Sequence, residues 1–185
     1  MKLMIASDIH GSAYYCRKLL DAFDEHHADR LVLLGDILYH GPRNPLPQGH
    51  DPKAVAAMLN DVKDSLLCVR GNCDCEVDQM VLEFSVMAEY AWICADGVTI
   101  FATHGHKFNP DNPPPLKKGD VLANGHTHIP VIKDMGDYTP VQPPYKDYTT
   151  QNQLEYNDKE DAALERRIFW GNLPTIFLYF LRFRY

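Results

Sequence analysis

Seven side chains that can bind a metal ion stand after short apolar segments in the first 128 residues. They are two carboxylates, one amide and four imidazoles: Asp8, His10, Asp36, Asn72, His104, His126 and His128. Mixed oxygen and imidazole ligands suit borderline divalent ions such as Mn²⁺, Fe²⁺ or Zn²⁺ better than a soft thiolate site does. Seven groups are too many for one tetrahedral ion, but they suit two ions that share a carboxylate. The pattern predicts a dinuclear metal centre.

Each of these residues has an ordinary structural explanation when it is considered alone. A single His at a strand end usually forms a hydrogen bond, and a Gly-Asp or Gly-Asn pair usually marks a turn. The ordered set is much more specific, because its members follow five separate apolar segments. We therefore interpret the whole set as metal ligands.

The apolar segments predict the strands that would bring these side chains together. They comprise residues 2–7, 31–34, 66–69, 98–103 and 120–123. Helical spacing over residues 13–27 and about 53–62 separates the first three segments, so strands and helices alternate as in an α/β protein with parallel strands. The carboxyl ends of strands form the ligand crevice in open α/β sheets. Five such ends are therefore expected to meet at one site.

The composition is that of a globular protein whose partners are small. The chain has 185 residues, of which 45% are hydrophobic and 23% are charged. Its formal net charge of −7 argues against nucleic acid or an anionic membrane as a partner, because proteins that bind these carry a basic face. An acidic chain would also repel a phosphate substrate unless cations were held at the site.

The cysteines and the first residues predict a cytoplasmic protein. The five cysteines are an odd number and form no CxxC pair, which favours reduced thiols over a disulfide framework. The apolar run that precedes Asp8 is too short for a signal peptide or a membrane span.

Five short segments resemble the motifs of the calcineurin-like metallophosphoesterase family. They are Asp8-Ile9-His10-Gly11, Gly35-Asp36, Gly71-Asn72-Cys73-Asp74, Thr103-His104-Gly105-His106 and Gly125-His126-Thr127-His128. Within the family, residues 40–44 (HGPRN) and 70–80 (RGNCDCEVDQM) resemble the YfcE-type phosphodiesterases of bacteria. The resemblance runs from Met1 to about residue 134. It implies that residues 1–134 form a metallophosphoesterase domain, an α/β fold with a β-sandwich flanked by helices.

The resemblance also implies how the ligands divide between two ions. The first ion would be held by Asp8, His10, Asp36 and His128. The second would share Asp36 and would also be held by Asn72, His104 and His126. Two divalent ions, Mn²⁺ first and Zn²⁺ or Fe²⁺ as alternatives, would activate a bridging hydroxide for in-line attack on a small phosphodiester. The implied activity is that of a phosphoric diester hydrolase.

Further catalytic roles follow from the same motifs. Besides Asn72 and His104, the resemblance points to Cys73, which stands where many family members have a His that stabilises the leaving group. A neutral thiol is a weak donor, so we expect a preference for good leaving groups, with an inert cysteine as the alternative. Asp74 is expected to orient a ligand histidine. Arg43 is expected to bind a phosphate oxygen, with a solvated loop arginine as the alternative.

The sequence departs from the family in its last fifty residues. Members normally continue into an Asn-Pro-Gly-Ser turn and further strands, whereas residues 139–145 read TPVQPPY. We interpret residues 135–185 as an atypical tail, with a charged helical segment over 157–168 and an aromatic run over 177–185. The C-terminal strands are then altered, and an exposed sheet edge would favour a homo-oligomer. A frameshift is one hypothesis for its origin, because codons for residues 138–145, read in a shifted frame, can encode His-Pro-Gly-Ser-Ala-Ser-Ile.

Two other functions are compatible with this resemblance. A phosphomonoesterase or a nuclease would use the same metal ions on a different substrate. A non-catalytic scaffold of the retromer-subunit type would keep the fold for protein contacts. Degraded ligand positions would favour the scaffold, but all seven are present.

Overall fold

The computed structural model describes residues 1–95, 97–128, 131–132, 135, 138–142, 164–169 and 178–183. Its elements in chain order are β1 (Lys2–Ala6), α1 (Ala13–Glu25), β2 (Arg30–Leu33), α2 (Pro52–Asp61), a 3-10 turn (Lys63–Ser65), β3 (Leu66–Cys68), α3 (Glu76–Gln79), β4 (Tyr90–Ala95), β5 (Val98–Thr103), β6 (Asp120–Ala123), β7 (Val131–Ile132), β8 (Tyr138–Gln142), β9 (Leu164–Phe169) and β10 (Leu178–Phe183). The elements form a mixed α/β fold, as predicted.

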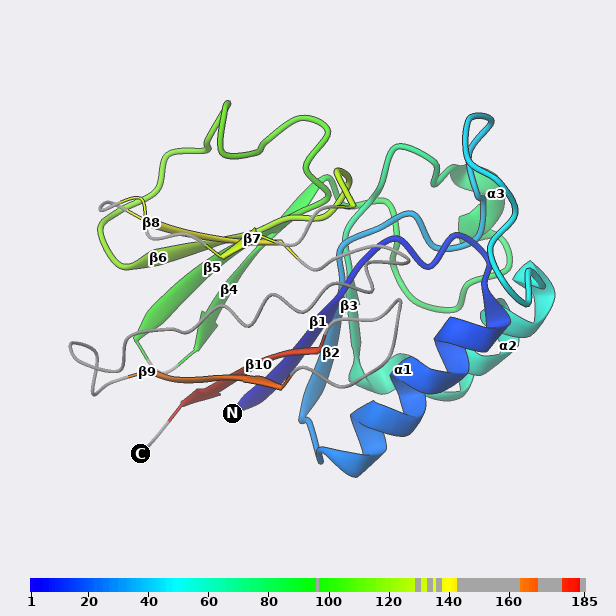
Figure 1. Ribbon diagram of the computed structural model, residues 1–185, viewed down its shortest axis with the longest axis horizontal. Helices are drawn as coiled ribbons and strands as arrows, with labels where there is room; N and C mark the ends of the chain where they lie inside the picture. The colour runs from blue at the N-terminus through cyan, green and yellow to red at the C-terminus, as the bar shows by residue number, and fades with distance from the viewer. Residues whose placement is uncertain are drawn as a thin grey trace.

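The described strands form two sheets of five strands each. One has the order β3-β2-β1-β10-β9, and the other has the order β4-β5-β6-β8-β7. β1, β2 and β3 are parallel, as are β5, β6 and β8. Figure 1 shows the sheets as two layers, with α1 and α2 beyond the first sheet. This is the sandwich flanked by helices that the family resemblance implied.

Two apolar cores hold these layers together. Alternate side chains of β1 point to opposite faces, as expected for a strand. Met4 packs with α1 and α2, whereas Leu3 and Ile5 pack with β5 and β6 in the core between the sheets. The run of apolar residues in β1 is therefore explained by burial on both faces.

Side-chain caps position the two long helices. The hydroxyl of Ser12 accepts the N–H of Tyr15 at 3.2 Å at the start of α1. The carboxylate of Asp51 accepts the N–H of Ala54 at 3.1 Å, and Pro52 opens α2. Each cap satisfies a backbone donor that the first helical turn leaves unpaired.

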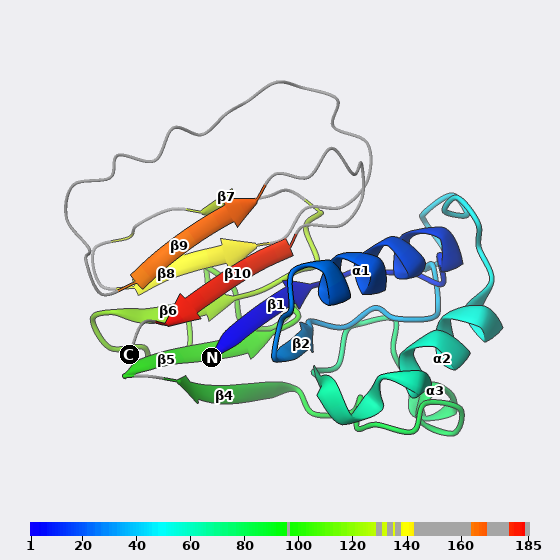
Figure 2. The same cartoon turned by 90° about the horizontal axis from the view of Figure 1, so that it is seen from below.

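The tail differs from the sequence expectation. The helix predicted over residues 157–168 is wrong for residues 164–168, which belong to strand β9, and residues 157–163 lie outside the described part. β10 pairs antiparallel with β1, so the edge of β1 that an altered tail would expose is covered (Figure 2). The helix prediction failed because tertiary pairing overrides local propensity. None of the described helices is long and apolar enough to cross a membrane.

Candidate metal centre

The loops that follow five strands meet at one end of the two sheets (Figure 1). These strands are β1, β2, β3, β5 and β6, and each loop carries predicted ligands. The backbone ties the loops to one another directly: the N–H of Asp8 donates to Gly35 at 3.0 Å, and the N–H of Gly125 donates to His104 at 2.7 Å. The predicted convergence of strand ends is confirmed.

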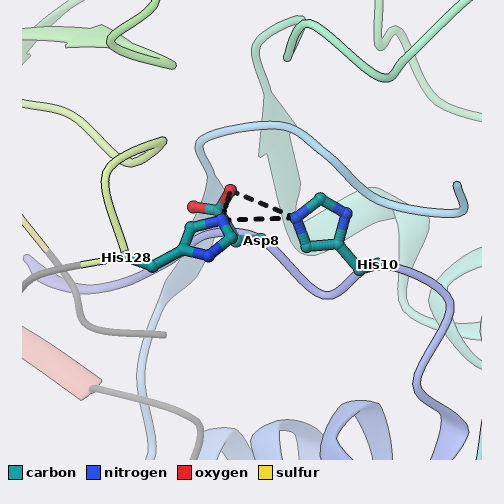
Figure 3. A group of neighbouring side chains, drawn as sticks. All are labelled: Asp8, His10 and His128. Atoms are coloured by element: carbon teal, nitrogen blue, oxygen red, sulfur yellow. Dashed lines mark hydrogen bonds and ion pairs between the residues drawn. The ribbon is translucent and has the colours of Figure 1, made fainter. Parts of the chain in front are cut away.

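Asp8, His10 and His128 form one compact group (Figure 3). Nε2 of His128 lies 3.1 Å from Oδ1 of Asp8. Nε2 of His10 lies 3.4 Å from Nε2 of His128 and 3.5 Å from the same Asp8 oxygen. Two histidines from loops 118 residues apart thus face one carboxylate.

Asp36 lies between this group and a second set of ligand atoms. Its Oδ2 is 3.7 Å from Nε2 of His10 and 3.5 Å from Nε2 of His104. The same His104 nitrogen lies 3.0 Å from Oδ1 of Asn72. Asp36 is thereby placed to serve both sides of the site.

His126 is beside the second set without joining a compact group. Its ring centroid is 5.0 Å from that of His104, and its backbone N–H donates to Oδ2 of Asp8 at 3.1 Å. In the described part of the chain, possible ligand atoms form three compact groups, and His126 belongs to none of them: Asp8, His10 and His128; His10, Asp36 and Cys73; and Asp8, Asp36 and His104. His106 is also adjacent, with its ring centroid 5.4 Å from that of His104.

The other ring nitrogens of two histidines are held by backbone carbonyl groups. Nδ1–H of His10 donates to Tyr39 at 2.7 Å, and Nδ1–H of His104 donates to Leu34 at 2.8 Å. Because Nδ1 carries the donated proton, Nε2 of the neutral ring offers its lone pair toward the carboxylates, the usual arrangement for metal-binding histidines, and it can donate to them only when the ring is protonated. The sequence had no signal for these acceptors, because every residue has a carbonyl group.

The arrangement of lone pairs fits bound cations. Burial alone would raise the pKa of Asp8, but hydrogen bonds with His10 and His128 lower it overall, so the carboxylate is ionised. The pKa of His10 is raised by Asp8 against the effect of burial. Buried imidazole nitrogens and carboxylate oxygens face one another here, and a proton or a metal ion must offset their repulsion. The set of donors suits a borderline divalent ion.

The backbone of the predicted ligands adopts an unusual conformation. Positive φ angles between 50° and 74° occur at Asp8, His10, Asp36, His126 and His128. Residues other than glycine seldom adopt this left-handed conformation, and such strained positions cluster at functional sites.

Asp74 has a different partner from the one predicted. Its carboxylate accepts the backbone N–H groups of Asp36 at 2.8 Å, Ile37 at 2.8 Å and Gly71 at 2.7 Å. The expectation that it orients a ligand histidine is therefore corrected. The buried carboxylate instead fixes the backbone of the turn after β2 and of the turn after β3, because it accepts three of their N–H groups.

Cys73 lies against Asp36 and the loop of Arg43. Its N–H donates to Oδ1 of Asp36 at 2.8 Å, and Asn72 Nδ2 lies 3.3 Å from its sulfur. Burial and the nearby Asp36 carboxylate raise the pKa of the thiol to about 12, so it is neutral. A Cβ added at Gly41 would lie 3.3 Å from this sulfur, which places the start of the loop beside the site. Arg43 is exposed.

The chain matches known phosphoesterases over most of its length. Residues 1–149 match the model of the calcineurin-like phosphoesterase superfamily domain. The chain is 50% identical to Phosphodiesterase YfcE of Escherichia coli K12 over 137 residues, which is 74% of each protein. It also resembles the solved structure of that phosphoesterase from E. coli, with a TM-score of 0.76 and 47% identity over 77% of this chain and 78% of the other.

A more distant likeness concerns the fold alone. Vps29 of Chaetomium thermophilum has a TM-score of 0.53 and 15% identity over 83% of this chain and 79% of the other.

Proposed function

The chain belongs to the calcineurin-like phosphoesterase superfamily, and from this premise we propose that it is a phosphodiesterase with two divalent ions, of which Mn²⁺ is the first candidate. The 50% identical phosphodiesterase supports the reaction, and membership of the family supports its dependence on metal ions. The number and identity of the ions are our inference from the set of ligands.

One observation carries the proposal. Asp36 presents one oxygen between His10 and His104, at 3.7 Å and 3.5 Å from their Nε2 atoms. A single carboxylate flanked by imidazoles from two sides is what a shared ligand of two ions requires. We assign one ion to Asp8, His10, Asp36 and His128. We assign the other to Asp36, Asn72, His104 and His126.

The chain's own residues prepare the site for a phosphodiester. Divalent ions held there would supply a nucleophile at neutral pH and neutralise charge on the phosphoryl oxygens. Asp74 holds the turn of Asp36 through backbone N–H groups, and the carbonyls of Tyr39 and Leu34 hold the histidine rings. The exposed Arg43 is our candidate for binding a phosphoryl oxygen as the substrate enters.

The remaining assignments are also proposals. We place the catalytic domain at residues 1–134 and the atypical tail at 135–185. All five cysteines are free thiols, which supports a cytoplasmic location. A net charge of −7 supports a small phosphodiester, rather than nucleic acid, as the substrate. Assembly into a homo-oligomer stays a prediction.

The test compares two Asp→Asn substitutions in the Mn²⁺-supplemented protein. Asp36→Asn should lower kcat/KM for bis(p-nitrophenyl) phosphate by at least about 100-fold, because a metal centre supplies several kcal/mol of charge stabilisation. Asp120→Asn is the matched control, because Asp120 opens β6 and accepts the N–H of Lys117 in its turn. An unchanged rate for Asp36→Asn, or no metal-dependent cleavage by the parent protein, would refute the proposal.

A further inference from the structure

The turn that carries His126 and His128 is held from behind by two buried amide side chains. Asn124 is fully buried, and Gln142 is 6% exposed. They stand at the ends of two parallel strands, β6 and β8, in which Ala123 is opposite Val141. The backbone N–H of Asn124 continues this ladder by donating to Val141 at 2.9 Å. Asn124 and Gln142 are therefore neighbours by register.

The two amides converge on the peptide that precedes His126. Nε2 of Gln142 donates to the Gly125 carbonyl at 2.9 Å and to the hydroxyl of Thr127. Nδ2 of Asn124 lies 3.2 Å from the same carbonyl and 3.3 Å from Oε1 of Gln142. Gln142 thus binds the residue before His126 and the residue after it.

The turn needs such restraint because its backbone is strained. The φ angles of His126 and His128 are 74° and 60°, in the left-handed region. Such conformations persist only where the surrounding structure imposes them. The turn is also packed against Ser7, the residue after β1, since a Cβ at Gly125 would lie 1.9 Å from its Oγ.

We propose that Asn124 and Gln142 are positioning residues that set the directions of the His126 and His128 rings, and thereby the affinity for divalent ions. The inference rests on the proposed metal centre. The two amides act through Gly125 and Thr127. Residues behind metal ligands commonly contribute in this way to affinity, since they determine where the ligand can point.

The test is Mn²⁺ binding by calorimetry to the full chain. Gln142→Leu removes the three hydrogen bonds that the side chain forms with described residues, while roughly keeping its volume. We expect the Kd for Mn²⁺ to rise about 10- to 100-fold. The thermal midpoint of the metal-free protein should fall by about 2–6 °C, since polar groups are left unpaired.

Thr139→Val is the matched control, because Thr139 is another buried polar residue of the same strand. It should leave the Kd for Mn²⁺ unchanged. Gln142→Asn keeps the amide but shortens its reach, so its Kd should lie between those of the parent and Gln142→Leu. This variant also provides the measurement if Gln142→Leu does not fold.

The outcomes separate this inference from the proposed function. If the parent binds Mn²⁺ and the Gln142 variants bind it equally well, with only the metal-free midpoint lowered, the amides are merely structural and the inference is wrong. If the folded parent does not bind Mn²⁺, the metal centre itself fails and the inference falls with it.

Discussion

Three of the proposed ligands offer one atom to the site and use another to hold their place. His10 and His104 use Nδ1 for a backbone carbonyl and present Nε2 to the carboxylates. Asp36 uses Oδ1 for the N–H of Cys73 and presents Oδ2. These partners are backbone groups of Tyr39, Leu34 and Cys73. Substitution of the side chains of these three residues therefore leaves the hydrogen bonds available.

The neutral thiol of Cys73 predicts a steep dependence on the leaving group. A thiol is a weaker donor than a hydroxyl, so it gives little help to a poor leaving oxygen. Cys73→Ser should therefore raise kcat/KM for alkyl phosphodiesters relative to aryl phosphodiesters, by roughly 3- to 10-fold if one better hydrogen bond forms. A series of diesters with graded leaving groups measures this ratio. An identical ratio in both proteins would show that Cys73 is inert.

At the scale of elements, the turns after the strands pack too closely for side chains. A Cβ added at Gly71, just after β3, would lie 2.0 Å from Oδ1 of Asp36 and 2.4 Å from its nitrogen. The turn after β2 and the turn after β3 therefore touch backbone to backbone, and Asp74 binds both of them. Glycine at position 71 therefore lets the turn after β3 pack directly against Asp36 and fix the position of its carboxylate.

Gly71→Ala should damage the metal centre although no ligand is changed. Relief of the clash requires Asp36 to move, and we expect the Mn²⁺ affinity to fall about 10-fold or more, as for other changes behind metal ligands. Calorimetry with Mn²⁺ measures the effect. Gly119→Ala is the control, because a Cβ there meets nothing within 4 Å, although its φ of +91° still strains the backbone. Equal losses of affinity in both variants would contradict the steric explanation.

At the scale of the whole molecule, the site depends on two sheets held at a common end. The core between them includes Ile5 of β1, Val32 of β2, Ile100 of β5 and Val121 of β6, four strands that lead to predicted ligands. β10 extends the first sheet beyond β1 in the antiparallel direction (Figure 2). The C-terminal part of the chain thus completes the sheet that carries Asp8.

Removal of this strand should weaken the whole molecule. A chain that ends at Gln142 loses the pairing of β1 with β10, in which Leu3 is opposite Leu181. We expect the thermal midpoint to fall by roughly 5 °C or more, since several backbone hydrogen bonds of about 1 kcal/mol each are lost. Light scattering should show association through the exposed edge of β1. An unchanged midpoint and a monomeric shortened chain would argue against this pairing.

The sequence by itself determined the family and the group of residues that meet. Polar residues after five apolar segments predicted the convergence at the sheet ends, because the carboxyl ends of neighbouring parallel strands lie at the same edge. Asp8, Asp36 and His104 could be chosen on these grounds alone. Their roles as ligands stay a prediction until metal binding is measured.

Only the tertiary structure decided what holds these residues in place. Asp74 binds backbone N–H groups in place of the expected histidine, and Gln142 reaches the turn of His126 from another strand. Backbone donors and acceptors are present at every residue, so the sequence cannot tell which of them will be paired. The same holds for β9, where pairing with β10 produced a strand in a segment predicted to be helical. Residue types and spacing therefore predicted the chemistry of the candidate metal centre, whereas its geometry arose from contacts between distant segments.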